Sequence, residues 1–181
     1  MNKSSNTLSN KFFLFAALLL AMTTPVNAQM GLAVSAGSGS DGGIVGVALI
    51  THKDFWTHSF KNGWSIRTNL ESSVTQISGS GTNGKDLVVL GLTPVVRFEP
   101  KSSSGFLELG IGVNYFDKKN LNDHKSVGTH FEFGDIFGVG LKFGSQNQHE
   151  IGYRFIHYSN AGVSTNNPGI DFHMLRLKTA F

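Results

Sequence analysis

Large apolar residues alternate with glycine or charged residues along most of the chain that follows the first thirty residues. A period of two is typical of β-strands, because successive side chains point to opposite faces of a sheet. In residues 107–115, leucine, isoleucine, valine and tyrosine occupy every second position, and Glu108, Asn114 and two glycines occupy the positions between them. The alternation predicts an all-β protein.

Eight segments carry this alternation and are separated by turn-forming residues. Their predicted ranges are 30–38, 43–51, 63–75, 86–98, 105–116, 129–143, 148–159 and 170–181. A soluble sandwich buries its large apolar side chains, whereas a small membrane barrel points them at lipid and fills its lumen with polar residues and glycine. Glycine alternating with Glu, Arg and Lys would make a poor soluble core. We therefore predict an eight-stranded antiparallel transmembrane β-barrel.

The first 28 residues have the features of a secretory signal peptide. Lys3 and Lys11 give a positive start, residues 12–22 form an apolar run, and a small-residue cleavage pattern ends at Ala28. The run is too short to span a membrane as a helix. We expect cleavage after Ala28, which leaves residues 29–181 as the barrel.

Composition excludes several classes of function. The chain has no cysteine, so a disulfide framework, a zinc–thiolate site and a cysteine nucleophile are ruled out. The formal charge of +3 suits a phosphate-bearing partner, but no basic run indicates nucleic-acid binding. No clustered metal-ligand pattern and no dinucleotide fingerprint is present, so we expect neither a metal nor a cofactor.

The end of the chain predicts both location and topology. Phe181 closes an amphipathic strand, which resembles the C-terminal signature of bacterial outer-membrane proteins. With both termini in the periplasm, the long polar connection at 117–128 is extracellular and the short one at 144–147 is periplasmic. The connection at 159–169 then lies at the outer rim.

That rim holds the candidate catalytic residues. His157 and Ser159 are two apart on one strand and share a face, about 6.6 Å apart along the backbone. Asp171 opens the returning strand and can approach His157 from the side. Serine, a base and an acid that orients the base are the parts of an activated nucleophile. Asn160, Asn167 and the Gly162 backbone N–H are candidate oxyanion donors.

The alternation also predicts where this group points. His157 and Ser159 continue the lipid-facing row of their strand, so an acyl ester in the outer leaflet would meet them directly. His173 lies on the same outward face and is a rival base. Asp135 breaks the pattern, because it falls on a lipid-facing position; a bulge or an interfacial location would explain it.

Residues 153–171 resemble the PagL family of lipid A 3-O-deacylases. The matching elements are His157, Ser159 and Asn160 within HYSNAG, followed by Asn167, Gly169 and an acidic residue at 171. The resemblance implies an outer-membrane barrel that hydrolyses the ester at the 3-position of lipid A and releases a 3-hydroxy fatty acid. It assigns Ser159 as nucleophile, His157 as general base and Asp171 as orienting acid, with no metal. The family acid is usually Glu, so Asp171 is a departure.

Three alternatives stay open at this point. A non-catalytic small barrel would bind or adhere through its loops. A periplasmic lipid carrier of lipocalin type would point its apolar face inward, which the glycine pattern disfavours. An acyltransferase acting on the same lipid would share the acyl-enzyme but use another acceptor. Lipid A, lipopolysaccharide and outer-membrane lipids are the expected partners, and a homodimer is left open.

Overall fold

A computed structural model of the chain describes residues 30–39, 45–78, 85–122, 125–165 and 169–181. The predicted signal peptide and its cleavage site lie outside these ranges. None of the described residues forms a helix that is long and apolar enough to cross a membrane.

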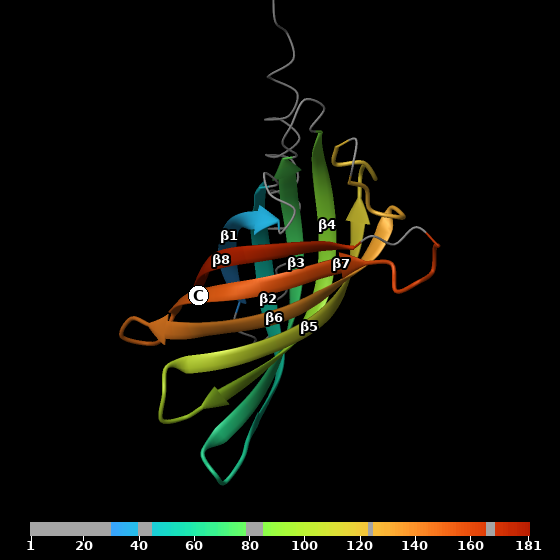
Figure 1. Cartoon of the computed structure of the whole chain (residues 1–181). Coiled ribbons are helices and arrows are strands. Elements are labelled where there is room, and N and C mark those ends of the chain that lie inside the picture. Colours follow the sequence, from blue (N-terminus) through green and yellow to red (C-terminus); the bar gives the residue numbers. More distant parts are fainter. Residues whose placement is uncertain (1–29, 40–44, 79–84, 123–124, 166–168) are drawn as a thin grey trace, which may run out of the picture.

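The chain forms eight antiparallel strands that close into a barrel (Figure 1). The strands are β1 (Met30–Gly39), β2 (Val45–Ser59), β3 (Trp64–Ser78), β4 (Asp86–Pro100), β5 (Gly105–Phe116), β6 (Phe131–Phe143), β7 (His149–Ser159) and β8 (Ile170–Ala180). Each strand pairs with the next, and β1 also pairs with β8, so the wall is continuous. Closure satisfies the backbone groups that an open sheet would leave unpaired. The predicted fold class is confirmed.

The largest difference from the predicted ranges is in β2, which was expected to end at residue 51 and continues to Ser59. A bulge lies between Asp54 and Trp56, where the register with β3 shifts by one residue. Up to Asp54 the even-numbered residues face the lumen, and beyond the bulge they face outward. This reversal interrupts the two-residue alternation, so the sequence pattern did not reveal the second half of the strand.

The two faces of the wall differ as predicted. Most outward positions on β5 to β8 are apolar and solvent-accessible in the isolated chain, for example Ile111 at 64 % and Leu175 at 68 %. Inward positions on the same strands are buried, as Glu108 and Arg176 show. An apolar outer face around a charged interior is the arrangement of a barrel that sits in lipid.

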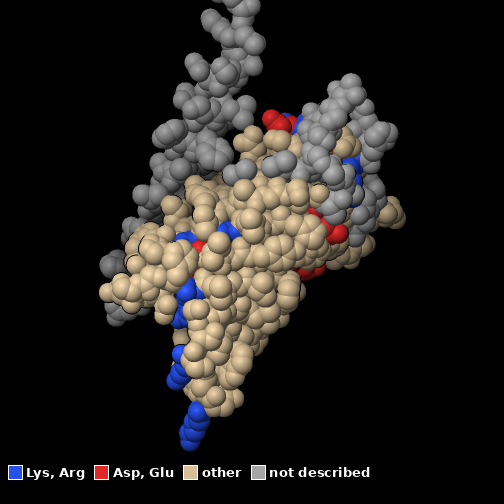
Figure 2. All heavy atoms as spheres, turned by 60° about the vertical axis from the view of Figure 1, so that its left-hand side comes forward, with Lys and Arg blue, Asp and Glu red and all other residues tan. Residues whose placement is uncertain are grey.

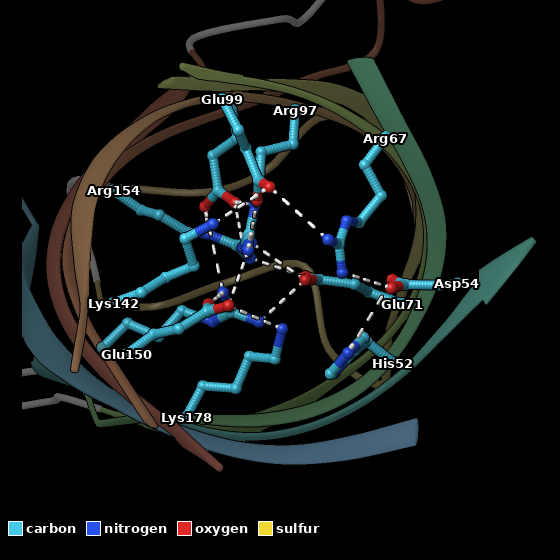
Figure 3. A network of polar contacts seen from close by, with 12 residues as sticks. His52, Asp54, Arg67, Glu71, Arg97, Glu99, Lys142, Glu150, Arg154 and Lys178 are labelled. Atoms are coloured by element: carbon cyan, nitrogen blue, oxygen red, sulfur yellow. Dashed lines mark hydrogen bonds and ion pairs between the residues drawn. The ribbon is translucent and has the colours of Figure 1, made fainter. Parts of the chain in front are cut away.

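One half of the lumen is filled by ion pairs (Figure 3). Arg154 donates to both carboxylate oxygens of Glu71, at 2.6 and 2.9 Å, and to Glu108 at 2.5 Å. Arg97 bridges Glu108 and Glu150, at 2.8 and 2.7 Å. We call this group the lumen network; its members are Asp54, Arg67, Glu71, Arg97, Glu99, Glu108, Lys142, Glu150, Arg154, Arg176 and Lys178. Pairing offsets the cost of burying these charges.

Gly138 shows why glycine alternates with these charges. A Cβ atom built on Gly138 would lie 2.8 Å from the Glu108 side chain and 3.2 Å from Arg154 Cγ. A side chain at this position would therefore displace two members of the lumen network.

Toward the other end the lumen contains an apolar cluster, which the sequence did not predict. Its side chains form an apolar plug of Ile77, Leu87, Val89, Phe116, Leu121, Val127, Tyr158, Ile170, Phe172 and Met174. Leu121 and Val127 come from the β5–β6 connection, which was expected to be a long polar extracellular loop. Both are almost fully buried, so this connection turns back and covers the end of the barrel.

The two ends of the barrel carry different connections. Strands β1, β3, β5 and β7 finish at one end of the barrel, and the C-terminus with the β2–β3, β4–β5 and β6–β7 turns lies at the opposite end (Figure 1). The apolar plug is at the first end and the lumen network lies deeper. The β7–β8 connection, where the candidate catalytic residues gather, is therefore on the plugged end.

Candidate active site

His157 and Asp171 form the centre of the candidate site. They are direct partners in the β7–β8 ladder, and both side chains point outward. The His157 ring nitrogen Nδ1 lies 2.5 Å from Asp171 Oδ1, with the side chains 39 % and 37 % exposed. The expected approach of Asp171 to His157 is thus present. Because the carboxylate occupies Nδ1, the other ring nitrogen, Nε2, is left to act on a nucleophile.

Ser159 is the last residue of β7 and stands two positions beyond His157 on the same face. Its partner on β6 is Phe133, whose side chain is 40 % exposed on the outer surface. His157 and Asp171 are therefore in contact, and Ser159 lies on the same outward face, at the rim of the barrel. The wall around them is apolar.

Gly169 packs against the imidazole of His157. A Cβ atom built on Gly169 would lie 2.9 Å from His157 Cε1 and 3.6 Å from Nε2. The backbone of Gly169 also has a φ of +63°, a conformation that residues other than glycine rarely adopt. Gly169 belongs to the sequence match quoted above, but its contact with the ring could not be read from the sequence.

The three expected oxyanion donors have different positions. Asn160 is buried, and its Oδ1 accepts hydrogen bonds from the backbone N–H groups of Gly162, at 3.1 Å, and Ser164, at 3.4 Å. Asn160 therefore shapes the turn after β7, in which Ala161 and Gly162 have left-handed backbone conformations. Asn167 lies outside the described residues.

Asp135 lies on the other side of His157. It is the direct partner of His157 in the β6–β7 ladder, as Asp171 is in the β7–β8 ladder. The register of β6 with both neighbours is continuous at this point, so a bulge is not the explanation for its outward position. The candidate base is thus flanked on the outer wall by two carboxylates, only one of which is hydrogen-bonded to it.

His173, the rival base, has a different partner. Its Nδ1 lies 2.6 Å from the hydroxyl of Tyr153, and its ring contacts Phe155 at a centroid distance of 5.5 Å. His173 pairs with Phe155 in the β7–β8 ladder. This pair is the next outward-facing pair after His157 and Asp171, further from the rim of the barrel. Among the residues that the structure describes, no carboxylate is hydrogen-bonded to its ring as Asp171 is to His157, which makes His173 the weaker candidate.

Within the described ranges, no group of three or more His, Cys, Asp and Glu side chains is placed to hold a metal ion. Two other histidines of these ranges make hydrogen-bond contacts away from the candidate site. His130 contacts the Phe116 carbonyl at 2.6 Å and His149 contacts the Thr179 hydroxyl at 3.1 Å.

Comparison with known proteins identifies relatives of the same fold. The model of the family described as "Lipid A 3-O-deacylase (PagL)" matches residues 43–180. The lipid A deacylase PagL of Bordetella bronchiseptica is 32 % identical over 124 residues, which cover 66 % of each chain. The Pseudomonas aeruginosa enzyme of the same name is 38 % identical over 100 residues, covering 54 % of this chain and 56 % of its own. These matches span less than two thirds of either relative.

A solved structure agrees over a longer stretch. The crystal structure of the outer membrane enzyme PagL superposes with a TM-score of 0.74 at 27 % identity, covering 82 % of this chain and 98 % of that one. The family match includes β2 to β8 and therefore both strands that carry His157, Ser159 and Asp171. The chain belongs to the PagL family of lipid A 3-O-deacylases.

Proposed function

We propose that this protein is an outer-membrane esterase that removes the 3-O-linked 3-hydroxyacyl chain from lipid A. The observation that carries the proposal is the outward His157–Asp171 pair, which stands beside Ser159 on a wall that faces lipid. A water-soluble ester would have to enter the membrane to reach this surface. An acyl chain already in the bilayer would lie along it.

In this proposal Ser159 is the nucleophile and His157 the general base. The Ser159 hydroxyl attacks the ester carbonyl carbon while His157 Nε2 takes its proton. His157 then protonates the sugar oxygen at the 3-position as the carbon–oxygen bond breaks, which leaves the acyl chain on Ser159. Water, activated by the same imidazole, releases the 3-hydroxy fatty acid and restores the serine.

Asp171 holds the imidazole in the tautomer that this sequence of steps requires. Its 2.5 Å contact keeps the proton on Nδ1 and stabilises the imidazolium that forms after proton transfer. The shorter side chain of Asp, compared with the Glu expected for the family, reaches His157 because the two residues are direct cross-strand partners. The replacement is therefore compatible with the proposed role.

Asn160, Gly162 and Asn167 are the proposed donors to the oxyanion. The Gly162 N–H donates to Asn160 Oδ1 in this structure, so it would have to exchange that acceptor for the substrate oxygen. The location that follows from the proposal is the outer membrane, with the β7–β8 connection facing the outer leaflet.

Mass spectrometry of lipid A tests the proposed activity. Cells whose lipid A carries a 3-O-linked acyl chain would express the wild type, Ser159→Ala or the matched control Ser145→Ala, an exposed serine in the β6–β7 turn. We expect loss of one 3-hydroxyacyl group with the wild type and the control, and intact lipid A with Ser159→Ala. Intact lipid A in all three, with folded barrels, would contradict the proposed substrate, whereas deacylation by Ser159→Ala would contradict the mechanism.

A further inference from the structure

Both tryptophans of the chain lie on one hairpin, far from the candidate active site. Trp56 is on β2 and Trp64 begins β3, and their side chains are 50 % and 47 % exposed. His58 stacks on Trp56 at a centroid distance of 5.8 Å, and Phe60 contacts His58 edge-on at 4.7 Å. We call residues 55–64 the aromatic hairpin.

The bulge in β2 is what turns these rings outward. Across from β2, Leu70 is exposed on the outer wall and Glu71 is buried in the lumen, so even-numbered residues of β3 face outward. Trp56 pairs with Thr68 and His58 pairs with Ile66, which places both rings on the outer face. Without the extra residue the two rings would point into the charged lumen. The outer wall therefore continues as a ladder of aromatic rings.

The aromatic hairpin extends the barrel at the end opposite the candidate active site (Figure 1). The first residue of β1, Met30, pairs with Lys53 of β2. From Lys53, β2 continues for six more residues to Ser59, beyond the edge of β1. The rings therefore stand at the edge of the outer wall and not in its middle.

Basic side chains accompany the rings. The Lys101 backbone N–H donates to the Gly63 carbonyl at 2.8 Å, which holds the β4–β5 turn against the aromatic hairpin. Lys61 and Lys101 are both exposed, and residues 55–64 contain no acidic residue. Figure 2 shows basic side chains at the lower tip of the molecule, where the aromatic hairpin ends. Aromatic rings next to lysines suit the boundary between acyl chains and phosphate groups.

We propose that the aromatic hairpin is a membrane anchor that binds the phospholipid headgroup layer at the end of the barrel opposite the candidate active site. The rings of Trp56 and Trp64 lie among the glycerol and carbonyl groups, and Lys61 and Lys101 reach the phosphates. Since the hairpin is continuous with the wall, anchoring it fixes the depth and tilt of the barrel. The inference does not depend on the catalytic proposal or on which leaflet the hairpin meets.

Tryptophan fluorescence tests the anchor without any activity measurement, because all tryptophan emission comes from the aromatic hairpin. The full-length mature chain would be folded into phosphatidylcholine vesicles whose acyl chains carry bromine near the headgroup or near the chain end. We expect blue-shifted emission that shallow bromine quenches more strongly than deep bromine. The single-tryptophan variants Trp56→Phe and Trp64→Phe should each show the same order.

Two controls calibrate the depth in a chain that lacks both tryptophans. Phe137→Trp places the ring in the middle of the outer wall of β6, where deep bromine should quench more strongly, and Lys119→Trp places it in a polar connection, where neither lipid should quench. Emission of the wild type that behaves like Lys119→Trp would overturn the anchor. Blue-shifted emission that neither lipid quenches would also overturn it, and would indicate that a second copy of the chain covers the rings.

Discussion

Arg154 and His157 lie three residues apart on β7, but they point to opposite faces of the barrel wall and meet opposite surroundings. Arg154 is 2 % exposed and its guanidinium is bonded to two carboxylates inside the lumen. His157 has a single carboxylate partner and a side chain that is 39 % exposed on the outer face. In one barrel strand, the inward-facing positions can therefore stabilise the fold while the outward-facing positions carry groups suited to chemistry.

Substitutions on the inward and the outward face of β7 should therefore change the free energy of unfolding by different amounts. Removing one member of a buried ion-pair network leaves its partners with too little opposite charge and costs about 3–5 kcal/mol. An ion pair that is more than a third exposed contributes only about 0–1 kcal/mol. The His157–Asp171 contact adds little to the free energy of folding, which is consistent with a role in binding or catalysis.

Asp171→Asn should have the largest effect on turnover among the changes considered below. An amide cannot stabilise the imidazolium and does not hold the required tautomer, and the equivalent change in a serine triad lowers kcat on the order of 10⁴-fold. The measurement is release of 3-hydroxy fatty acid from purified lipopolysaccharide. The free energy of unfolding should change by less than about 1 kcal/mol, and a loss of turnover below tenfold would contradict the assigned role.

Arg154→Met tests how much the lumen network contributes to stability. It leaves Glu71 and Glu108 without their shared guanidinium, so we expect a loss of about 3–5 kcal/mol in the free energy of unfolding. Denaturant titration in detergent micelles would measure it, with Asp171→Asn as the outward control. Barrels that do fold should keep their esterase turnover. Equal stability in the two variants would remove the contrast between the two faces.

Gly169→Ala tests the packing around the imidazole. The added methyl group would lie 2.9 Å from His157 Cε1 on a backbone with positive φ, so the ring must shift. A displacement of about 1 Å at a reacting group can cost on the order of 10²-fold in rate. Steady-state kinetics should show a fall in kcat with little change in KM. Gly63→Ala, in the distant β2–β3 turn, is a matched control, because its backbone is also left-handed but no atom lies within 4 Å of the added methyl group.

Asp135→Asn should have the smallest effect, less than about tenfold in kcat/KM. The residue flanks His157 as Asp171 does, but the carboxylate that accepts the hydrogen bond from His157 Nδ1 is that of Asp171. Because the two substitutions are chemically identical, comparing them separates orientation of the ring from the presence of nearby negative charge. A larger effect at Asp135 than at Asp171 would reverse the assignment of the acid.

The sequence predicts most of the fold because alternation is a local property. It gave the number of strands, the apolar outer face and the meeting of His157 with Asp171, since a hairpin joins their strands. It did not predict the second half of β2, because the bulge before Trp56 reverses the alternation. The burial of Leu121 and Val127 depends on how a long connection folds back over the barrel. The alternation of apolar and polar residues carries no information about that path. The contact of Gly169 with His157 likewise depends on the backbone path between two strands.

The central claim is that Ser159 is a nucleophile activated by His157, and covalent labelling tests it most directly. The folded wild type, Ser159→Ala and His157→Gln would be incubated in micelles with a long-chain alkyl fluorophosphonate, and intact-protein and peptide mass spectrometry would locate the adduct. We predict one adduct on Ser159 in the wild type, none in Ser159→Ala and a labelling rate lowered by several orders of magnitude in His157→Gln. An unlabelled wild type, or equal labelling of the wild type and His157→Gln, would contradict the claim.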